Sequence, residues 1–454
     1  MEGLAEAVSA AIKVGARVVG VSLSCAMHGL LALNDTMLPL TPVITWADAR
    51  SREQTRALRF SGQAALLHRE TGTPVHPMTP QSKLMWFARH EPGLTTTARW
   101  WVGLKDYLLW QLTGRLVTEL SSASGTGLLS LTTRQWSPTA VALSGVRPDQ
   151  LPPIVATTQV LPLTLAAATR LDLPAGTPVV AGAADGPLGN LGTGAIQPGV
   201  AGLSLGTSGA IRMVVPEPTI DDAGRLFCYA LTDDHWVIGG AVSNGGIVAR
   251  WAGAVFGTAS VDGVALDEHT LALAEAVPLG SEGLIMLPYL LAERAPLWDP
   301  DVPGAFLGIR RHHSAGHFVR AAVEGVCLQL SSILEQLDRI EPVRQVRATG
   351  GTFRSPLWRA VMAGTLNRPL HVTAGAEGTA AGAAALGLFA LDRAATLASA
   401  ASTLAGEETS VAVPVDPDDA AAYALVRSRL PKLVRGYEAV AELFDSPTVS
   451  TLST

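Results

Sequence analysis

Hydrophobic and polar positions follow two different periods along this chain. Continuous apolar runs of strand length predict buried β-strands at residues 16–24, 177–183, 200–205, 210–215, 236–240 and 343–348. Apolar residues at helical spacing predict helices at residues 4–13, 51–71, 81–90, 105–112, 245–256, 314–340, 356–366, 379–391 and 417–443. Because strands and helices alternate throughout, the predicted fold class is α/β.

The length of the chain indicates more than one domain. At 454 residues it exceeds what one hydrophobic core normally serves. We predict a first domain over residues 1–197, a second over residues 198–444, and a flexible tail at residues 445–454.

Composition and charge exclude several classes of protein. A hydrophobic content of 48%, a charged content of 16% and a net charge of −6 exclude a disordered chain, a basic nucleic-acid binder and a polybasic membrane anchor. The first eleven residues contain Glu2 and Glu6 where a secretory signal needs basic residues. The three cysteines lack zinc-site spacing and predict free thiols in a reducing compartment. We therefore expect a cytoplasmic protein without a nucleic-acid or membrane partner.

Asp185 is the candidate catalytic carboxylate. It follows the apolar run 177–183, and α/β sheets place their ligand chemistry at the carboxyl ends of strands. A carboxylate there can accept the proton of a sugar hydroxyl as its oxygen attacks phosphorus. The structural alternative is a helix N-cap, because Asp is common at such junctions.

Two glycine-rich turns are candidates for nucleotide binding. Gly206-Thr207-Ser208-Gly209 separates two predicted strands, and small residues there can present consecutive backbone N–H groups to phosphate. Residues 350–355, GGTFRS, join a strand to a helix, where glycines admit a flat base or ribose. Each turn could also be purely structural, an ordinary hairpin in one case and a helix start in the other.

The region after the first predicted strand carries candidate sugar ligands. Met27, His28, Trp46, Asp48 and Arg50 combine aromatic, imidazole, carboxylate and guanidinium groups that can stack on and hydrogen-bond a polyol. The alternatives are a core histidine at His28 and a local salt bridge between Asp48 and Arg50.

Taken in order, these segments resemble the FGGY carbohydrate kinases. The resemblance rests on the successive blocks VVGVSLSCAMHGL, ITWADAR, GLKDYLLWQLTG, AGAADGPLGNLGTGAIQPG, LSLGTSG, NGGIVARW and ATGGTFRSPLWRAVMAGTLNRPL. It implies two actin-like (ribonuclease H-like) domains with a cleft that closes on a sugar and ATP, with Mg²⁺ carried by ATP rather than by an assigned protein site.

The resemblance also implies roles for individual residues. Asp185 matches the general base of the family, and Arg250 stands where the family carries an amide. The nucleotide-contacting set it implies is Gly206, Thr207, Ser208, Gly246, Arg250, Gly350, Gly351 and Ser355.

Within the family, the blocks ITWADAR, TGTPVHPM and GRLFCYALTDDHWVIGGAVSNGGIVARW are most similar to members that phosphorylate gluconate. The predicted reaction is therefore D-gluconate to 6-phosphogluconate. Cys25 and Ala26 depart from the Gly-Gln-Met-His of xylulokinase-like members. The alternatives are a kinase for xylulose, ribulose or a similar polyol, a catalytically silent sugar- or nucleotide-binding homologue, and an actin-like assembly protein. The assembly state is open between a monomer and a homodimer.

Family members begin with a strand carrying Asp-x-Gly-Thr and a phosphate hairpin, whereas this sequence begins at the helix that follows. We expect a shortened gene model lacking roughly 60 residues, enough for about three short strands. Since that hairpin helps position the transferring phosphate, we expect the chain as printed to bind nucleotide but to have little or no gluconate kinase activity.

Overall fold

The computed structural model describes residues 2–257, 266–373, 378–405, 410–441 and 443. These form two compact units. The first comprises Met1–Pro198, Met213–Ile238 and Glu377–Glu408, and the second Gly199–Arg212, Gly239–Ala376 and Thr409–Thr454. The chain first passes from the first unit to the second after Pro198, one residue beyond the predicted division between residues 197 and 198, and it later returns to the first unit twice.

A three-stranded sheet organises the first unit, in the order β1 (Val21–Cys25), β7 (Pro178–Ala184) and β6 (Val160–Pro162). β1 runs parallel to β7, and β6 runs antiparallel to it. Alternate side chains of β1 face opposite sides of this sheet. Val21 and Leu23 pack with α6 (Leu104–Thr113) and α9 (Leu165–Leu171), whereas Ser22 lies against α15 (Gly378–Ala390).

A β-bulge near the end of β7 sets the direction of the residues that follow the strand. The register between β1 and β7 shifts between Ser22 and Ser24. Gly182, opposite this shift, has a φ of 79°, and a Cβ there would lie 1.8 Å from the carbonyl oxygen of Leu23. Only glycine fits, so the direction in which β7 delivers Asp185 depends on this residue.

Helix α15 reaches the first unit from far along the sequence. It packs on α10 (Asp185–Gly192), where the two helices meet through glycines. A Cβ on Gly192 would lie 1.7 Å from the carbonyl oxygen of Gly378, and one on Gly382 would lie 1.9 Å from that of Leu188. This close packing explains why Glu377–Glu408 belongs to the first unit.

The prediction of one helix over residues 51–71 is wrong. The segment forms α2 (Arg52–Phe60) and α3 (Gln63–Thr71), because Gly62 adopts a left-handed φ of 74° that ends the first helix. The strand predicted at residues 16–24 is confirmed only from Val21 onward.

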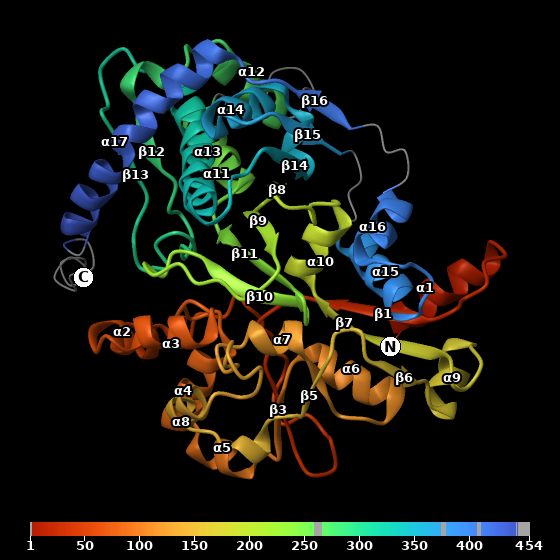
Figure 1. Cartoon of the computed structure of the whole chain (residues 1–454). Helices are drawn as coiled ribbons and strands as arrows, with labels where there is room; N and C mark the ends of the chain where they lie inside the picture. Colours follow the sequence, from red (N-terminus) through yellow and green to blue (C-terminus); the bar gives the residue numbers. More distant parts are fainter. Residues whose placement is uncertain (1, 258–265, 374–377, 406–409, 442, 444–454) are drawn as a thin grey trace. The chain divides into compact units, whose positions relative to one another are not determined.

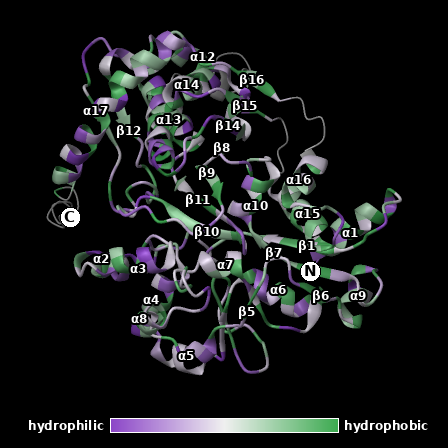
Figure 2. Cartoon of the chain, viewed as in Figure 1, coloured by the Kyte–Doolittle hydropathy of each residue, from purple (hydrophilic) through white to green (hydrophobic). Residues whose placement is uncertain are grey.

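The other helices and strands of the first unit are α1 (Glu2–Lys13), β2 (Leu31–Leu33), α4 (Pro80–His90), α5 (Pro92–Thr97), β3 (Trp100–Val102), β4 (Thr118–Glu119), α7 (Leu120–Ser124), α8 (Pro138–Ser144), η1 (Pro148–Gln150), β5 (Ile154–Val155), β10 (Phe227–Thr232) and α16 (Leu397–Ala405). A second core in this unit gathers around Leu84, Phe87 and Trp101. Hydrophobic residues run along β1, β7 and β10 (Figure 2).

The second unit contains a sheet in which β8 (Val200–Leu205), β14 (Gln345–Thr349) and β15 (Leu370–Val372) run parallel, with β16 (Val411–Val413) antiparallel at the edge. β9 (Gly209–Val215) and β11 (His235–Val242) extend it on the other side of β8, and the boundary between the units crosses both strands. The parallel strands β8 and β14 end at the same edge.

The long helix α13 (Ala315–Ile340) forms the centre of the second unit beside α11 (Gly246–Phe256), α12 (Leu266–Glu275) and α14 (Pro356–Leu366) (Figure 1). Val326, Leu330 and Ile333 of α13 are fully buried. The remaining elements are η2 (Ser281–Gly283), β12 (Ile285–Leu287), β13 (Ala305–Leu307), η3 (Gly351–Arg354) and α17 (Pro417–Ala441).

The alternation of strands and helices confirms the predicted α/β class. Within the described residues, no helix is both long and apolar enough to cross a membrane.

Candidate functional site

Asp185 lies where the sequence predicts, directly after β7. It is the first residue of α10, whose N-cap is Ala184, so the alternative of a simple cap does not describe it. Its Oδ1 accepts hydrogen bonds from the backbone N–H groups of Gly186 at 2.8 Å and Met27 at 3.2 Å. These two donors fix the orientation of the carboxylate and join it to the loop that follows β1.

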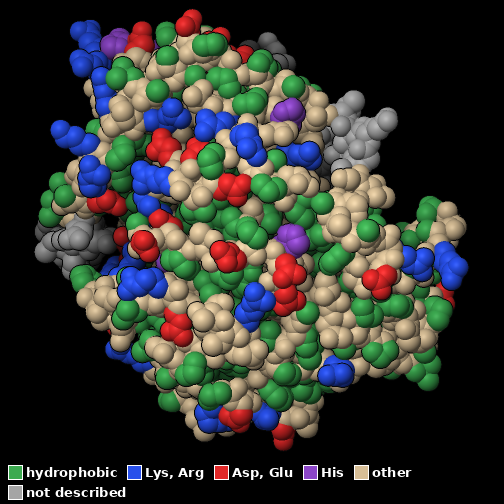
Figure 3. All heavy atoms as spheres, in the orientation of Figure 1, with side chains coloured by type: hydrophobic (Ala, Val, Ile, Leu, Met, Phe, Trp, Pro, Cys, Tyr) green, Lys and Arg blue, Asp and Glu red, His purple; other side chains and the backbone are tan. Residues whose placement is uncertain are grey.

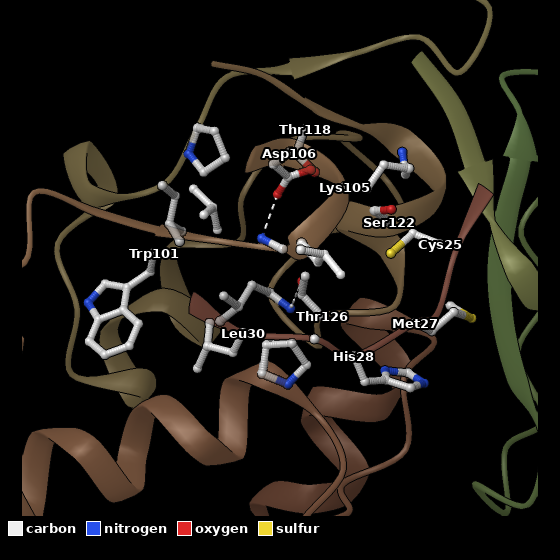
Figure 4. A pocket seen from close by; sticks show the side chains of 18 of the residues that line it. Cys25, Met27, His28, Leu30, Trp101, Lys105, Asp106, Thr118, Ser122 and Thr126 are labelled. Atoms are coloured by element: carbon white, nitrogen blue, oxygen red, sulfur yellow. Dashed lines mark hydrogen bonds between the residues drawn. The ribbon is translucent and has the colours of Figure 1, made fainter. Parts of the chain in front are cut away.

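Met27 and His28 form a tight turn at the pocket drawn in Figure 4. The N–H of Met27 joins this turn to Asp185. His28 has a left-handed φ of 64°, which is unfavourable for a residue with a Cβ. Its Nδ1 donates to the carbonyl oxygen of Gly125 at 2.7 Å, and its ring contacts Tyr229 edge-on at 5.9 Å. Because a carbonyl only accepts, Nδ1 carries the hydrogen of this bond. Strained residues of this kind often mark binding sites.

Asp48 and Arg50 form the local salt bridge that was one of the two alternatives for them. The guanidinium donates to both carboxylate oxygens at 2.9 Å and lies 4.8 Å from the ring centroid of Trp86. Burial raises the pKa of Asp48, but the hydrogen bonds and charge of Arg50 outweigh this and hold that pKa below its usual value. Trp46, 44% exposed, lies close by in sequence.

Lys83, a buried lysine of α4, is a residue near the site that the sequence pattern did not predict. Its Nζ donates to the carbonyl oxygens of Thr45 and Met78 at 2.7 Å each and of His28 at 3.1 Å. The sequence contains one indication of its importance: Lys83 lies among predominantly apolar neighbours in a predicted helix, in a chain with only four lysines.

A second buried lysine, Lys105 of α6, pairs with Glu119 at 2.5 Å and also donates to the carbonyl oxygen of Ala181 in β7 at 3.2 Å. Glu119 in turn accepts from the backbone N–H of Ser121 at 2.6 Å. The hydroxyl of Ser121 accepts from the N–H of Ala184 at 3.3 Å. This network therefore holds the end of β7 one residue before Asp185.

A pocket of the first unit borders these groups (Figure 4). Cys25, His28, Lys105 and Asp106 line it, together with apolar residues that include Trp101. Burial raises the pKa of Asp106 to about 6, and its Oδ2 accepts the N–H of Gly103 at 2.7 Å.

In the second unit the turn Gly206–Ser208 joins β8 to β9. Gly206 and Thr207 are exposed, and the N–H of Gly206 donates to the carbonyl oxygen of Ser208 at 2.9 Å. The N–H groups of Thr207 and Ser208 have no acceptor in the part of the chain that the structure describes. Consecutive unoccupied N–H groups in a turn form an anion-binding nest.

Three glycine-rich turns of the second unit meet at the edge where β8 and β14 end. The N–H of Gly246 donates to the carbonyl oxygen of Gly206 at 2.7 Å, and the N–H of Gly245 donates to that of Thr207 at 3.0 Å. Gly350, at a φ of 122°, leaves so little space that a Cβ would lie 2.1 Å from the carbonyl oxygen of Leu205. The structure thus brings together the 206–208, 245–246 and 350–351 segments.

The other predicted nucleotide residues border this junction. Arg250 is exposed on the first turns of α11, four residues after Gly246. Ser355 caps α14 by accepting the N–H of Trp358 at 3.4 Å. Space remains open at Gly351, where a Cβ would meet no atom within 4 Å.

The sequence pattern did not predict Glu293 and Asn244 either. The carboxylate of Glu293 is fully buried and accepts from the side chain of Asn244 at 2.5 Å and the N–H of Ser243 at 3.0 Å. Burial raises its pKa. These bonds fix the turn that leads into α11.

Among the described residues, no group of three or more His, Cys, Asp or Glu side chains is arranged to hold a metal ion. The face drawn in Figure 3 carries basic and acidic side chains interspersed, without a large area of one sign.

The chain matches the models of two adjacent protein domains. Residues 4–192 match the N-terminal domain, and residues 201–391 the C-terminal domain, of the FGGY family of carbohydrate kinases.

Three similar proteins illustrate this relationship. A gluconokinase of Bacillus licheniformis is 40% identical over 378 residues, covering 82% of this chain and 74% of that protein. The crystal structure of a gluconate kinase from Lactobacillus acidophilus has a TM-score of 0.87 at 32% identity, covering 95% of this chain and 86% of that one. A ligand-bound xylulose kinase from Lactobacillus acidophilus has a TM-score of 0.91 at 31% identity, covering 98% and 90%.

Proposed function

The chain belongs to the FGGY family of carbohydrate kinases, and on this premise we propose that it transfers the γ-phosphoryl group of ATP to D-gluconate. That it is a sugar kinase of the two-domain, actin-like fold follows from the family. The observation that carries the choice of gluconate is the 40% identity to a gluconokinase.

The two kinds of similarity favour different sugars. The TM-score is higher for the xylulose kinase, at 0.91, than for the gluconate kinase, at 0.87. Sequence identity is the better guide to which sugar is bound. Backbone superposition reports the shared scaffold, whereas side chains select the substrate.

In the proposed reaction, Asp185 accepts the proton of the sugar hydroxyl while the oxygen of that hydroxyl bonds to the γ-phosphorus. The bond from the γ-phosphorus to the bridging oxygen breaks, and ADP leaves. The two N–H donors on Oδ1 support this role, because they hold the carboxylate in one orientation before substrate binds.

The meeting of three glycine turns supports the proposed nucleotide site. Thr207 and Ser208 would donate their backbone N–H groups to phosphate oxygens, and Gly246 lies beside them. Gly351 and Ser355 would contact the adenosine. Mg²⁺ commonly binds through substrate phosphates and water with few protein ligands, so in this proposal it would arrive with ATP.

Met27, His28, Trp46 and Asp48 remain the proposed sugar contacts. We do not assign the carboxylate of gluconate to Arg50, because Asp48 already engages two of its N–H donors and offsets its charge. The free thiols Cys25, Cys228 and Cys327 support the proposed cytoplasmic location. Light scattering would decide whether the protein is a monomer or a homodimer.

The test is a coupled assay of ADP release with gluconate, xylulose, ribulose and glycerol, alongside calorimetric titration with ADP. Gluconate should give the highest kcat/KM. A preference for xylulose would establish the alternative that the 0.91 TM-score favours. Nucleotide binding without turnover of any sugar is the result that the silent-homologue alternative predicts.

A further inference from the structure

We propose that Lys83 is a positioning residue for the sugar, holding the His28 turn and the Thr45 loop in the geometry that binds substrate. The inference deepens the proposed function, since it rests on these two segments contacting the sugar. Lys83 itself would touch neither substrate nor nucleotide.

The first argument is the arrangement of the three hydrogen bonds. An ammonium group has three N–H donors, and each has a carbonyl acceptor within 3.1 Å. The acceptors belong to three separate segments: His28 follows β1, Thr45 precedes α2, and Met78 precedes α4. One buried cation therefore ties both predicted sugar loops to the start of a helix.

The second argument is the strained backbone of His28. A left-handed φ of 64° persists only where surrounding contacts enforce it. The N–H of Met27 is held by Asp185, the ring of His28 by Gly125, and the carbonyl oxygen of His28 by Lys83. Of these three anchors, Lys83 is the one that also binds the Thr45 loop.

The third argument is burial. Lys83 has no exposed surface, and a lysine is rarely placed there unless its charge is satisfied. Burial lowers the pKa of Lys83 to about 7. Of the charged groups near it, Asp48 raises this pKa and Arg50 lowers it. The titratable groups on the segments that it binds include His28 and His76. Three carbonyl acceptors favour the ammonium form, because a neutral amine has only two N–H groups.

The experiment compares Lys83→Met, which keeps the length and removes the donors, with Lys432→Met on the exposed side of α17 as a matched control. Kinetics use the sugar that the wild type phosphorylates best, and hydrogen exchange is followed without ligands. We expect the KM for sugar to rise about tenfold or more in Lys83→Met, with ADP affinity within twofold of wild type. Exchange should become faster at the amides of residues 28–30 and 44–46. Lys432→Met should change neither the KM for sugar nor the exchange at these amides.

A sugar KM within twofold of wild type, together with unchanged exchange at residues 28–30 and 44–46, would overturn the proposal. An equal loss of ADP affinity would also overturn it, because that result indicates general destabilisation. If Lys83→Met does not fold, Lys83→Gln, which keeps two N–H donors, serves in the same comparison. If the wild type phosphorylates no sugar, the proposed function fails, whereas the exchange comparison still decides the role of Lys83.

Discussion

Replacing Lys105 by methionine should strongly destabilise the first unit. The side chains of Lys105 and Glu119 are 2% and 0% exposed, and their charged atoms lie 2.5 Å apart. Removing the ammonium leaves the carboxylate buried, with the backbone N–H groups of Ser121 and Ser122 as its partners among the described residues. Breaking a buried pair in this way costs about 3–5 kcal/mol.

Two comparisons separate this effect from a general loss of packing. Arg89→Met breaks a pair whose side chains are 66% and 64% exposed, so it should cost about 1 kcal/mol or less. The double variant Lys105→Met with Glu119→Gln should be more stable than Lys105→Met, because a neutral amide needs no counter-charge and its one oxygen can still accept one of the two N–H groups at the start of α7.

The assay is urea unfolding followed by tryptophan fluorescence, supported by thermal melting. For a domain of 150–250 residues each kcal/mol shifts Tm by about 2–4 °C, so Lys105→Met should lower it by about 6–20 °C. A loss of less than about 1 kcal/mol, or a double variant that is no more stable than Lys105→Met, would refute the reasoning that an unpaired buried charge dominates.

Three further predictions concern activity. Asp185→Asn should lower kcat by orders of magnitude with little change in the KM for sugar, and near-normal turnover in the coupled assay would exclude Asp185 as the base. Gly350→Ala should weaken ADP binding measured by calorimetry, because its Cβ would lie 2.1 Å from the carbonyl oxygen of Leu205, whereas Gly351→Ala should preserve the fold because its Cβ meets open space. Burial lowers the pKa of Lys83 to about 7, so the ammonium loses its proton as pH rises through that value, and the sugar KM of the wild type should increase between pH 6 and 9. The sugar KM of Lys83→Met should lack the increase that comes from deprotonation of Lys83. Parallel pH profiles of the sugar KM for wild type and Lys83→Met would contradict the role assigned to Lys83.

Local sequence determined most of the helices and strands and the place of the principal motifs. The apolar run before Asp185 forms β7, and the long apolar stripe of residues 314–340 forms α13 as Ala315–Ile340. The ordered blocks also identified the FGGY family, which the domain matches confirm. These results follow because side-chain periodicity depends only on neighbouring residues and on whether one face is buried.

Tertiary structure alone decided which distant residues complete each unit. Glu377–Glu408 joins the first unit because glycines of α15 and α10 allow the two helices to approach closely. Lys83 and Lys105 read as ordinary helix residues in the sequence, but folding places carbonyl oxygens or a carboxylate around each ammonium. The physical reason is that the environment of a buried polar group is set by partners far along the chain, such as His28 for Lys83. Local periodicity contains no information about these partners.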